Sequence, residues 1–248
     1  SHFSFMFKQR LLKFLKNIII ILFLGITNFS HSQIYEIGYI TGKSNFIGDI
    51  GETKFVNPLY NNISKDWISG ISFKWNRSPR HSYRLTYIYT DLAANDLNSN
   101  DPRRIERGYF FRTPLSEFSI GMDFNFIDFD LHQPYNIITP YISTGIIHSK
   151  FKEQKLIEGI ITRQDFSEIT IGIPIILGIK YRFLNNFILS VETGARYTFT
   201  DKIDGNNYTD EIINYNFGNT NNNDWYMFTI MNISYTFGRN PCYCNIGK

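Results

Sequence analysis

Hydrophobic and polar residues alternate with a period of two along most of the chain after residue 33. Alternation over segments of about ten residues predicts β-strands, because successive side chains of a strand point to opposite faces. Polar connectors separate the segments, and none of them has the period of a convincing amphipathic helix. Eight strands are predicted: 34–43, 67–75, 83–91, 116–127, 139–149, 168–182, 187–200 and 225–237.

Each clear strand has one apolar face and one polar face. In the fourth strand Phe118 and Ile120 share one face. Glu117 and Asp123 lie on the other face. A charge that faces lipid at mid-membrane costs about 2–4 kcal/mol, whereas a polar residue inside a barrel costs little. The pattern therefore favours a membrane barrel whose apolar faces point outward, although the fifth strand leaves its face undecided.

The connectors alternate in length. Those after the first, third, fifth and seventh strands are long, and the others are shorter, with 184–186 the tightest. Outer-membrane barrels share this asymmetry of long extracellular loops and short periplasmic turns, with an even number of strands. Pro174 has no N–H to donate, so we expect a local bulge there. The predicted fold is all-β: an eight-stranded antiparallel up-and-down transmembrane β-barrel.

The N-terminal residues have the order of a secretory signal peptide. Lys and Arg residues between positions 8 and 16 precede the apolar run 18–26. That run is too short for a helix that crosses a hydrocarbon core, which takes about 20 residues. Ser30 and Ser32 supply the small residues that a signal peptidase requires, so cleavage before Gln33 is expected. The predicted parts are a signal peptide with its upstream residues (1–32), the barrel (33–238) and a periplasmic tail (239–248).

Composition adds two points. A formal net charge of +3 is too small to argue for nucleic acid as a partner, and the 16 Tyr, 23 Phe and 3 Trp suit the aromatic girdles of a barrel. The two cysteines, Cys242 and Cys244, lie in the tail and are too close together to staple a domain. A bond to a partner protein, a strained local bond and two free thiols all stay open.

The predicted inward positions carry charges of both signs in about equal number. With eight strands, the interior is just wide enough to be filled by side chains, which argues against an open pore. We expect the charges to form a buried salt-bridge network that holds the barrel shut, a structural role favoured here over a proton or ion path. The network comprises Glu36, Lys74, Arg84, Asp123, Lys180, Glu192 and Arg196.

Candidate catalytic groups are sparse. His148 and Ser149 are adjacent, so a strand points them to opposite faces and they cannot form a nucleophile and base pair. His81 and His132 fall in predicted turns. The sequence has no Gly-x-Ser-x-Gly, zinc spacing, Walker sequence or dinucleotide fingerprint. We therefore expect no enzyme activity, cofactor or metal.

Short motifs add a family resemblance. The strand start 35–38 is followed by 44–50, and 111–117 and 139–141 are further matches. Together they resemble a Bacteroidetes family of outer-membrane barrels, the PorG-like family, which serves the type IX secretion system. The most specific part is an Asn-aromatic-x-Gly-Asp turn motif, which comprises Asn45, Phe46, Gly48 and Asp49.

The resemblance implies a non-enzymatic barrel in the outer membrane of a Gram-negative, Bacteroidetes-like bacterium. Its expected partners are outer-membrane lipids and a periplasmic ring built from a lipoprotein and a partner protein. The 45–49 motif should form a tight extracellular turn with positive φ at Gly48, so it cannot touch that ring. The surfaces expected to face the ring are Arg77, Arg80, the turn 128–136 and the tail with Cys242 and Cys244.

Two other functions stay open. A generic outer-membrane barrel with a structural or adhesive role is the first alternative. A lipid-modifying outer-membrane enzyme is the second, although the scarcity of His argues against it. The polar loop 206–224 is expected to be a mobile extracellular loop.

Overall fold

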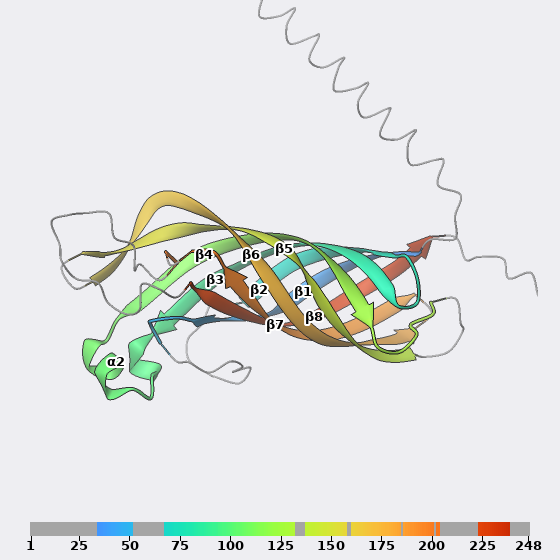
Figure 1. The fold of residues 1–248 in the computed structure, drawn as a ribbon, viewed down its shortest axis with the longest axis horizontal. Helices are drawn as coiled ribbons and strands as arrows, with labels where there is room; N and C mark the ends of the chain where they lie inside the picture. The colour runs from blue at the N-terminus through green and yellow to red at the C-terminus, as the bar shows by residue number, and fades with distance from the viewer. Residues whose placement is uncertain are drawn as a thin grey trace, which may run out of the picture. The chain divides into compact units, whose positions relative to one another are not determined.

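The described residues form one closed sheet of antiparallel strands in a computed structural model (Figure 1). The structure describes residues 34–51, 67–131, 137–157, 160–184, 186–200, 202–203 and 223–238. Each strand pairs with the next along the chain, and β8 returns to pair with β1, which confirms the predicted fold. The strands are β1 (Ile34–Ile47), β2 (Trp67–Asn76), β3 (His81–Asn95), β4 (Phe110–Asn125), β5 (Ile137–Ile157), β6 (Ile160–Leu184), β7 (Phe187–Thr198) and β8 (Trp225–Gly238).

The barrel has two different ends. We call the turn end the one where β2 joins β3, β4 joins β5 and β6 joins β7, and where β1 begins and β8 ends. The opposite end is the loop end. It carries η1 (Asp96–Asn98) and α2 (Pro102–Arg107) between β3 and β4. Neither these helices nor any other part of the described chain offers a helix long and apolar enough to cross a membrane.

The long connector predicted after the fifth strand is wrong. The strands β5 and β6 stay paired as far as Ile157 and Ile160, with one irregularity between Lys152 and Gln154. Residues 150–157 and 160–167 contain neither Gly nor Pro, so nothing in their sequence stops the ladder. The two strands therefore continue past their neighbours as a hairpin, which Figure 1 shows beyond the ends of β4 and β7.

The facing of the strands follows the predicted alternation. In β4 the side chains of Phe118 and Ile120 are exposed, whereas Glu117 and Asp123 are buried. The fifth strand, undecided from sequence, turns its odd-numbered residues inward from Thr139 to Phe151. The outer wall is mainly apolar through the middle of the strands, and the lumen holds the buried polar residues together with apolar clusters. This is the polarity of a barrel that faces lipid.

The predicted bulge at Pro174 is also wrong. Pairing of β6 with β7 passes through Pro174 without a shift in register. Pairing with β5 stops at Thr144 opposite Ile175 and resumes at Ile147 opposite Gly172 in the same register. The missing N–H of proline thus removes rungs from one ladder without inserting a residue. The hydroxyl of Thr144 donates a hydrogen bond of 2.9 Å to the carbonyl oxygen of Pro174.

Several predicted segments lie outside the described residues. They are the signal peptide and its cleavage site (1–33), the tail with Cys242 and Cys244 (239–248), and most of the loop predicted to be mobile (204–222). The predictions made for them stay predictions.

The apolar wall yields a first test by substitution. Leu177 lies near the middle of the outward row of β6, and Ile169 lies near its loop end. We expect Leu177→Arg to lower the free energy of unfolding by about 2–4 kcal/mol, and Ile169→Arg by about 0–1 kcal/mol, because lipid penalises a charge according to depth. Urea unfolding in lipid vesicles measures both. Equal losses at the two positions would contradict the membrane-facing assignment.

Candidate functional site

A cluster of paired charges fills the turn-end half of the lumen. Asp123 on β4 accepts a hydrogen bond of 2.8 Å from Lys74 on β2 and one of 3.1 Å from Arg84 on β3. Arg84 also donates to both carboxylate oxygens of Glu192 on β7, at 3.0 and 2.9 Å. All four side chains are at most 4% exposed. These pairs join strands across the lumen. Pairing is expected here because burying a charge without a partner is costly.

Tyr141 on β5 organises this cluster. Its hydroxyl donates a hydrogen bond to Glu192, and its ring centroid lies 5.2 Å from Nζ of Lys74 and 5.3 Å from Nζ of Lys180. The ring packs over Gly178 on β6, where a Cβ atom would come within 2.7 Å of it. Gly178 therefore makes room for the ring. Sequence analysis missed Tyr141 because it could not assign the inward face of this strand.

Two other predicted members lie at the edge of the cluster. Glu36 accepts hydrogen bonds of 2.8 Å from Asn76 and 3.1 Å from Ser234. Lys180 points its buried ammonium at the ring of Phe129, with 4.6 Å between Nζ and the ring centroid. Within the described part of the chain, that ammonium makes no hydrogen bond. Lys180 therefore lies against aromatic faces, with the carboxylates of Glu36 and Asp123 as counter-charges in the same lumen.

Arg196 does not belong to this cluster. It lies closer to the loop end, where its Nε is 3.6 Å from a carboxylate oxygen of Glu117 and its guanidinium lies over the ring of Phe228. The hydroxyl of Tyr226 donates a 2.6 Å hydrogen bond to Glu117 and lies 2.7 Å from Ser149 Oγ. Glu117 was predicted to face inward but was not assigned to the charge network. The lumen thus holds two separate polar groups.

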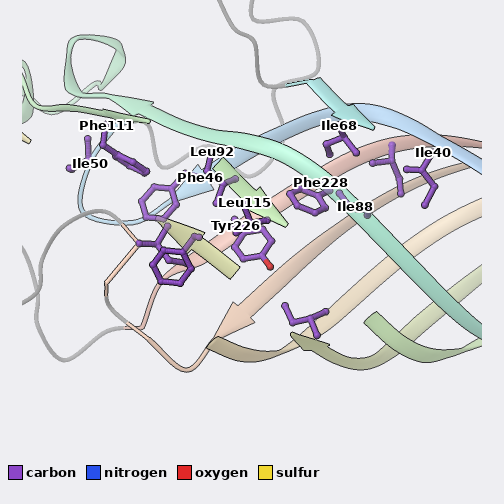
Figure 2. Close-up of a cluster of buried hydrophobic side chains, with 14 residues drawn as sticks. Ile40, Phe46, Ile50, Ile68, Ile88, Leu92, Phe111, Leu115, Tyr226 and Phe228 are labelled. Atoms are coloured by element: carbon purple, nitrogen blue, oxygen red, sulfur yellow. The ribbon is translucent and has the colours of Figure 1, made fainter. Parts of the chain in front are cut away.

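Apolar side chains close the lumen on both sides of the charges. At the turn end, Phe129, Ile137 and Ile188 form a small buried cluster, with Leu131 packed against it. At the loop end a larger cluster, the loop-end plug, brings together side chains from many strands (Figure 2). Its members are Ile40, Phe46, Ile50, Ile68, Ile88, Leu92, Phe111, Leu115, Ile147, Phe151, Ile203, Tyr226, Phe228 and Ile230.

The predicted turn motif forms part of this plug. Strand β1 continues to Ile47, so Asn45 and Phe46 lie on the strand and not in a tight turn. The ring of Phe46 meets that of Phe111 edge to face, with 4.9 Å between centroids. The positive φ expected at Gly48 occurs at Gly51 instead, at +85°. The chain therefore turns later than predicted, after Phe46 has entered the lumen.

A buried carboxylate ties two loops together above the plug. Asp96, which is fully buried, accepts hydrogen bonds from the backbone N–H groups of Gly51 (2.9 Å) and Tyr109 (3.0 Å). It also accepts one of 2.8 Å from Arg107 of α2. Arg107 and its neighbour Arg104 donate in turn to the carbonyl oxygens of Asp49 (2.7 Å) and Gly51 (2.8 Å). We call this arrangement the Asp96 clamp.

The clamp depends on the local sequence of the β3–β4 loop. Asp101 caps the N-terminus of α2 by accepting a 3.0 Å hydrogen bond from the N–H of Arg103, and Pro102 follows it at the first helical position. Gly108 ends the helix in the left-handed conformation, with φ of +68°. This short helix aims Arg104 and Arg107 at the segment 48–51. Two of the segments that carry the family resemblance, 44–50 and 111–117, also meet at the loop end, through the rings of Phe46 and Phe111.

The turn end presents a braced surface. Arg80, in the β2–β3 turn, forms an ion pair with Asp128 and donates a 2.6 Å hydrogen bond to the carbonyl oxygen of Phe126. The N–H of Phe129 donates to the carbonyl oxygen of Pro79 at 3.0 Å. The turn and the start of the β4–β5 connection are thus fixed to each other. Arg77 is exposed beside them.

Most of the buried charges are engaged with each other or with buried hydroxyl and amide groups, and His148 lies exposed on the outer wall. Across the described residues, no group of three or more His, Cys, Asp and Glu is placed to hold a metal ion.

An apolar outer wall around a lumen filled with side chains defines a membrane-embedded β-barrel. Within that class, the chain belongs to the family described as Domain of unknown function (DUF6089), whose model matches residues 14–246. A search of curated proteins finds no match.

Solved structures with similar folds are outer-membrane barrels of distant sequence. The N-terminal β-barrel domain of Pseudomonas aeruginosa OprF is 12% identical, with a TM-score of 0.43, over 84% of this chain and 98% of that chain. Ail of Yersinia pestis, in complex with a heparin analogue, is 11% identical, with a TM-score of 0.42, over 84% and 100%. A major outer membrane protein of Thermus thermophilus is 13% identical, with a TM-score of 0.44, over 84% and 100%. At these scores the similarity says nothing about function.

The charge cluster predicts different effects of two buried substitutions on the free energy of unfolding. Asp123→Asn leaves Lys74 and Arg84 short of a counter-charge, so we expect it to lower the free energy of unfolding by about 3–5 kcal/mol. Lys180→Met removes a buried ammonium that makes no hydrogen bond, so stability should stay within about 1 kcal/mol or rise. Urea unfolding in vesicles gives both values. A loss above about 2 kcal/mol for Lys180→Met would contradict this account of the cluster.

The Asp96 clamp predicts a local effect. Asp96→Ala removes the acceptor shared by Gly51, Arg107 and Tyr109, so α2 should open and trypsin should cleave at its arginines faster than in the wild type. The barrel should stay folded, since its ladders do not involve Asp96. Leu97→Ala, at an exposed neighbouring side chain, is the matched control and should leave the cleavage rate unchanged. Mass spectrometry of the timed digest identifies the cut sites.

Proposed function

We propose that the chain is a non-enzymatic barrel of a Gram-negative outer membrane that acts as a structural or assembly component of the type IX secretion machinery. In this role it anchors a periplasmic ring, made of a lipoprotein and its partner, to the membrane. The proposal combines the filled lumen with the family resemblance of segments 35–38, 44–50 and 111–117.

The observation that carries the proposal is the packed lumen. Charges joined across the barrel and apolar clusters on either side of them fill the interior. A barrel filled in this way offers no route for a solute. Its work then lies with surfaces, namely the outer wall and the two ends. An anchoring role asks only for such surfaces.

The turn end supports the anchoring role. In an outer-membrane barrel the short turns face the periplasm, and this is the side on which a ring would dock. The Arg80–Asp128 pair and the backbone bond between Phe129 and Pro79 hold this face in one conformation. A preformed surface loses little conformational entropy on binding. Arg77 adds an exposed positive charge for an acidic patch of the partner.

A second candidate function rests on the loop end. The β5–β6 hairpin extends past neighbouring strands, and α2 presents Arg103, which is 91% exposed. Phe166 on the hairpin is 74% exposed. An exposed ring on a projecting hairpin suits contact with another surface outside the cell, as in an adhesive barrel. The two functions use opposite ends of the molecule and can be separated.

A charge reversal at each end provides the test. Arg77→Glu changes the turn end without breaking the Arg80–Asp128 pair, and Arg103→Glu makes the same change at the loop end. Tagged wild type and both variants are isolated under native conditions from detergent-solubilised outer membranes of the source organism, and co-purified proteins are quantified by mass spectrometry. We expect the ring lipoprotein and its partner with the wild type and with Arg103→Glu, and at least a five-fold loss with Arg77→Glu.

Deletion of the gene completes the test. Secretion of type IX cargo should fall while outer-membrane integrity, measured by detergent sensitivity, is unchanged. If the ring proteins never co-purify and cargo secretion is normal, the anchoring role is wrong. Loss of attachment to surfaces on deletion, with normal secretion, would then favour the adhesive role.

A further inference from the structure

On the described strands, most of the charged side chains that point outward lie near the loop end. Along the regularly paired strands, the turn end presents His81 beside rings such as Tyr83, Phe124 and Tyr181. The loop end is different. Its outward positions hold Lys43, Asp91, Arg112, His148, Lys150 and Lys152. Arg112 and Asp91 form an ion pair at 2.7 Å, and Asp165 is exposed farther along the hairpin, so the outward basic groups are concentrated on β5 between His148 and Lys152.

Three of these residues form one row on β5. His148, Lys150 and Lys152 alternate along the strand, so they share the outward face about 7 Å apart. Below them that face is apolar, with Ile138 58% and Ile146 63% exposed. From Ile138 to His148 a strand tilted by about 45° rises roughly 23 Å, close to the height of about 25 Å of a lipid-facing band. The basic row therefore begins where the hydrocarbon ends.

The aromatic girdle is interrupted at this place. At the loop end of the wall, β2 carries Trp67 and β8 carries Trp225, the kind of ring that sits at the headgroup level. Across β4, β5 and β6 the register instead aligns Ser116, Lys150 and Ile169. Ser116 thus lies on one side of Lys150 and Ile169 on the other, and neither is an aromatic residue.

We propose that this sector of the wall binds a phosphorylated lipid of the leaflet that surrounds the loop end. Its phosphate lies against Lys150, Lys152 and His148, and its acyl chains run down the wall over Ile146 and Ile171. Ammonium groups at the hydrocarbon boundary attract anionic headgroups, whereas aromatic rings lie at the headgroup level without selecting for a negative charge. Lys152 also donates to the backbone carbonyl oxygen of Asp165, which fixes its side chain above the row.

The site requires only that the barrel lies in a membrane, so it is independent of the secretion role. It also gives the barrel a chemical difference between its two rims. The outward positions of the strands are basic in one sector near the loop end and mainly aromatic near the turn end.

Native mass spectrometry of the full barrel in detergent tests the site. The probes are a diphosphorylated, multiply acylated glucosamine lipid (lipid A), the same lipid with its phosphates removed, and inorganic phosphate. We expect the wild type to retain one lipid A and Lys150→Gln/Lys152→Gln to bind it roughly 25-fold more weakly, about five-fold per charge. Lys43→Gln, which removes a loop-end charge on β1, is the matched control and should bind as the wild type does.

Each other outcome overturns the proposal. Equal binding of the dephosphorylated lipid shows that the wall holds acyl chains without reading phosphate. Full competition by millimolar inorganic phosphate shows a free phosphate site. An unchanged affinity of the double variant places the lipid elsewhere. If the double variant fails to fold on a cold SDS gel, Lys150→Gln is compared with Lys150→Arg, which keeps the charge and should keep the lipid.

Discussion

The pairing of β1 with β8 is the constraint on which the rest of the molecule depends. It runs from Ile34 opposite Gly238 to Ile47 opposite Trp225 and leaves the sheet without an edge. In hydrocarbon, an unpaired backbone N–H or carbonyl group costs several kcal/mol, so a strand can cross lipid only in a closed ladder. Closure then fixes which faces meet lipid and which meet the lumen, and so decides where every charge can lie.

Charged side chains in the lumen meet that constraint by pairing with partners from different strands. Arg84 bridges Asp123 and Glu192, and Glu117 lies beside Arg196 in a second polar group. Such pairs add little net stability over a hydrophobic core of equal volume, because desolvation offsets attraction. They do restrict which strands can lie opposite each other, since any other arrangement would leave a buried charge without a partner. The apolar clusters lie on either side of the pairs and separate them from the two ends of the described barrel.

The sequence was sufficient for the fold and for the inward face of the clear strands, the fifth being the exception. Alternation placed Glu36, Arg84 and Lys180 inward because a period of two reports the face of a residue directly. It could not report height along the barrel, which depends on the register between neighbouring strands. Arg196 was therefore grouped with charges that lie nearer the turn end.

Other features were missed for different physical reasons. Tyr141 lies on a strand where small and polar residues occupy both faces, so hydrophobic contrast was too weak to orient it. The Asp96 clamp joins two loops through backbone groups of Gly51 and Tyr109, and such contacts leave no periodic signal in the sequence. The hairpin of β5 and β6 was predicted to be a loop because its charged residues obscure the alternation that marks a strand.

The braced turn end has a mechanical consequence. Arg80 and the bond between Phe129 and Pro79 join two connections that belong to four different strands. A force applied to this face is therefore shared among β2, β3, β4 and β5 at once and passes up the wall as shear on their hydrogen-bond ladders. Many rungs loaded in parallel resist far more than a single loop pulled open. A barrel built in this way resists local deformation of its turn-end face.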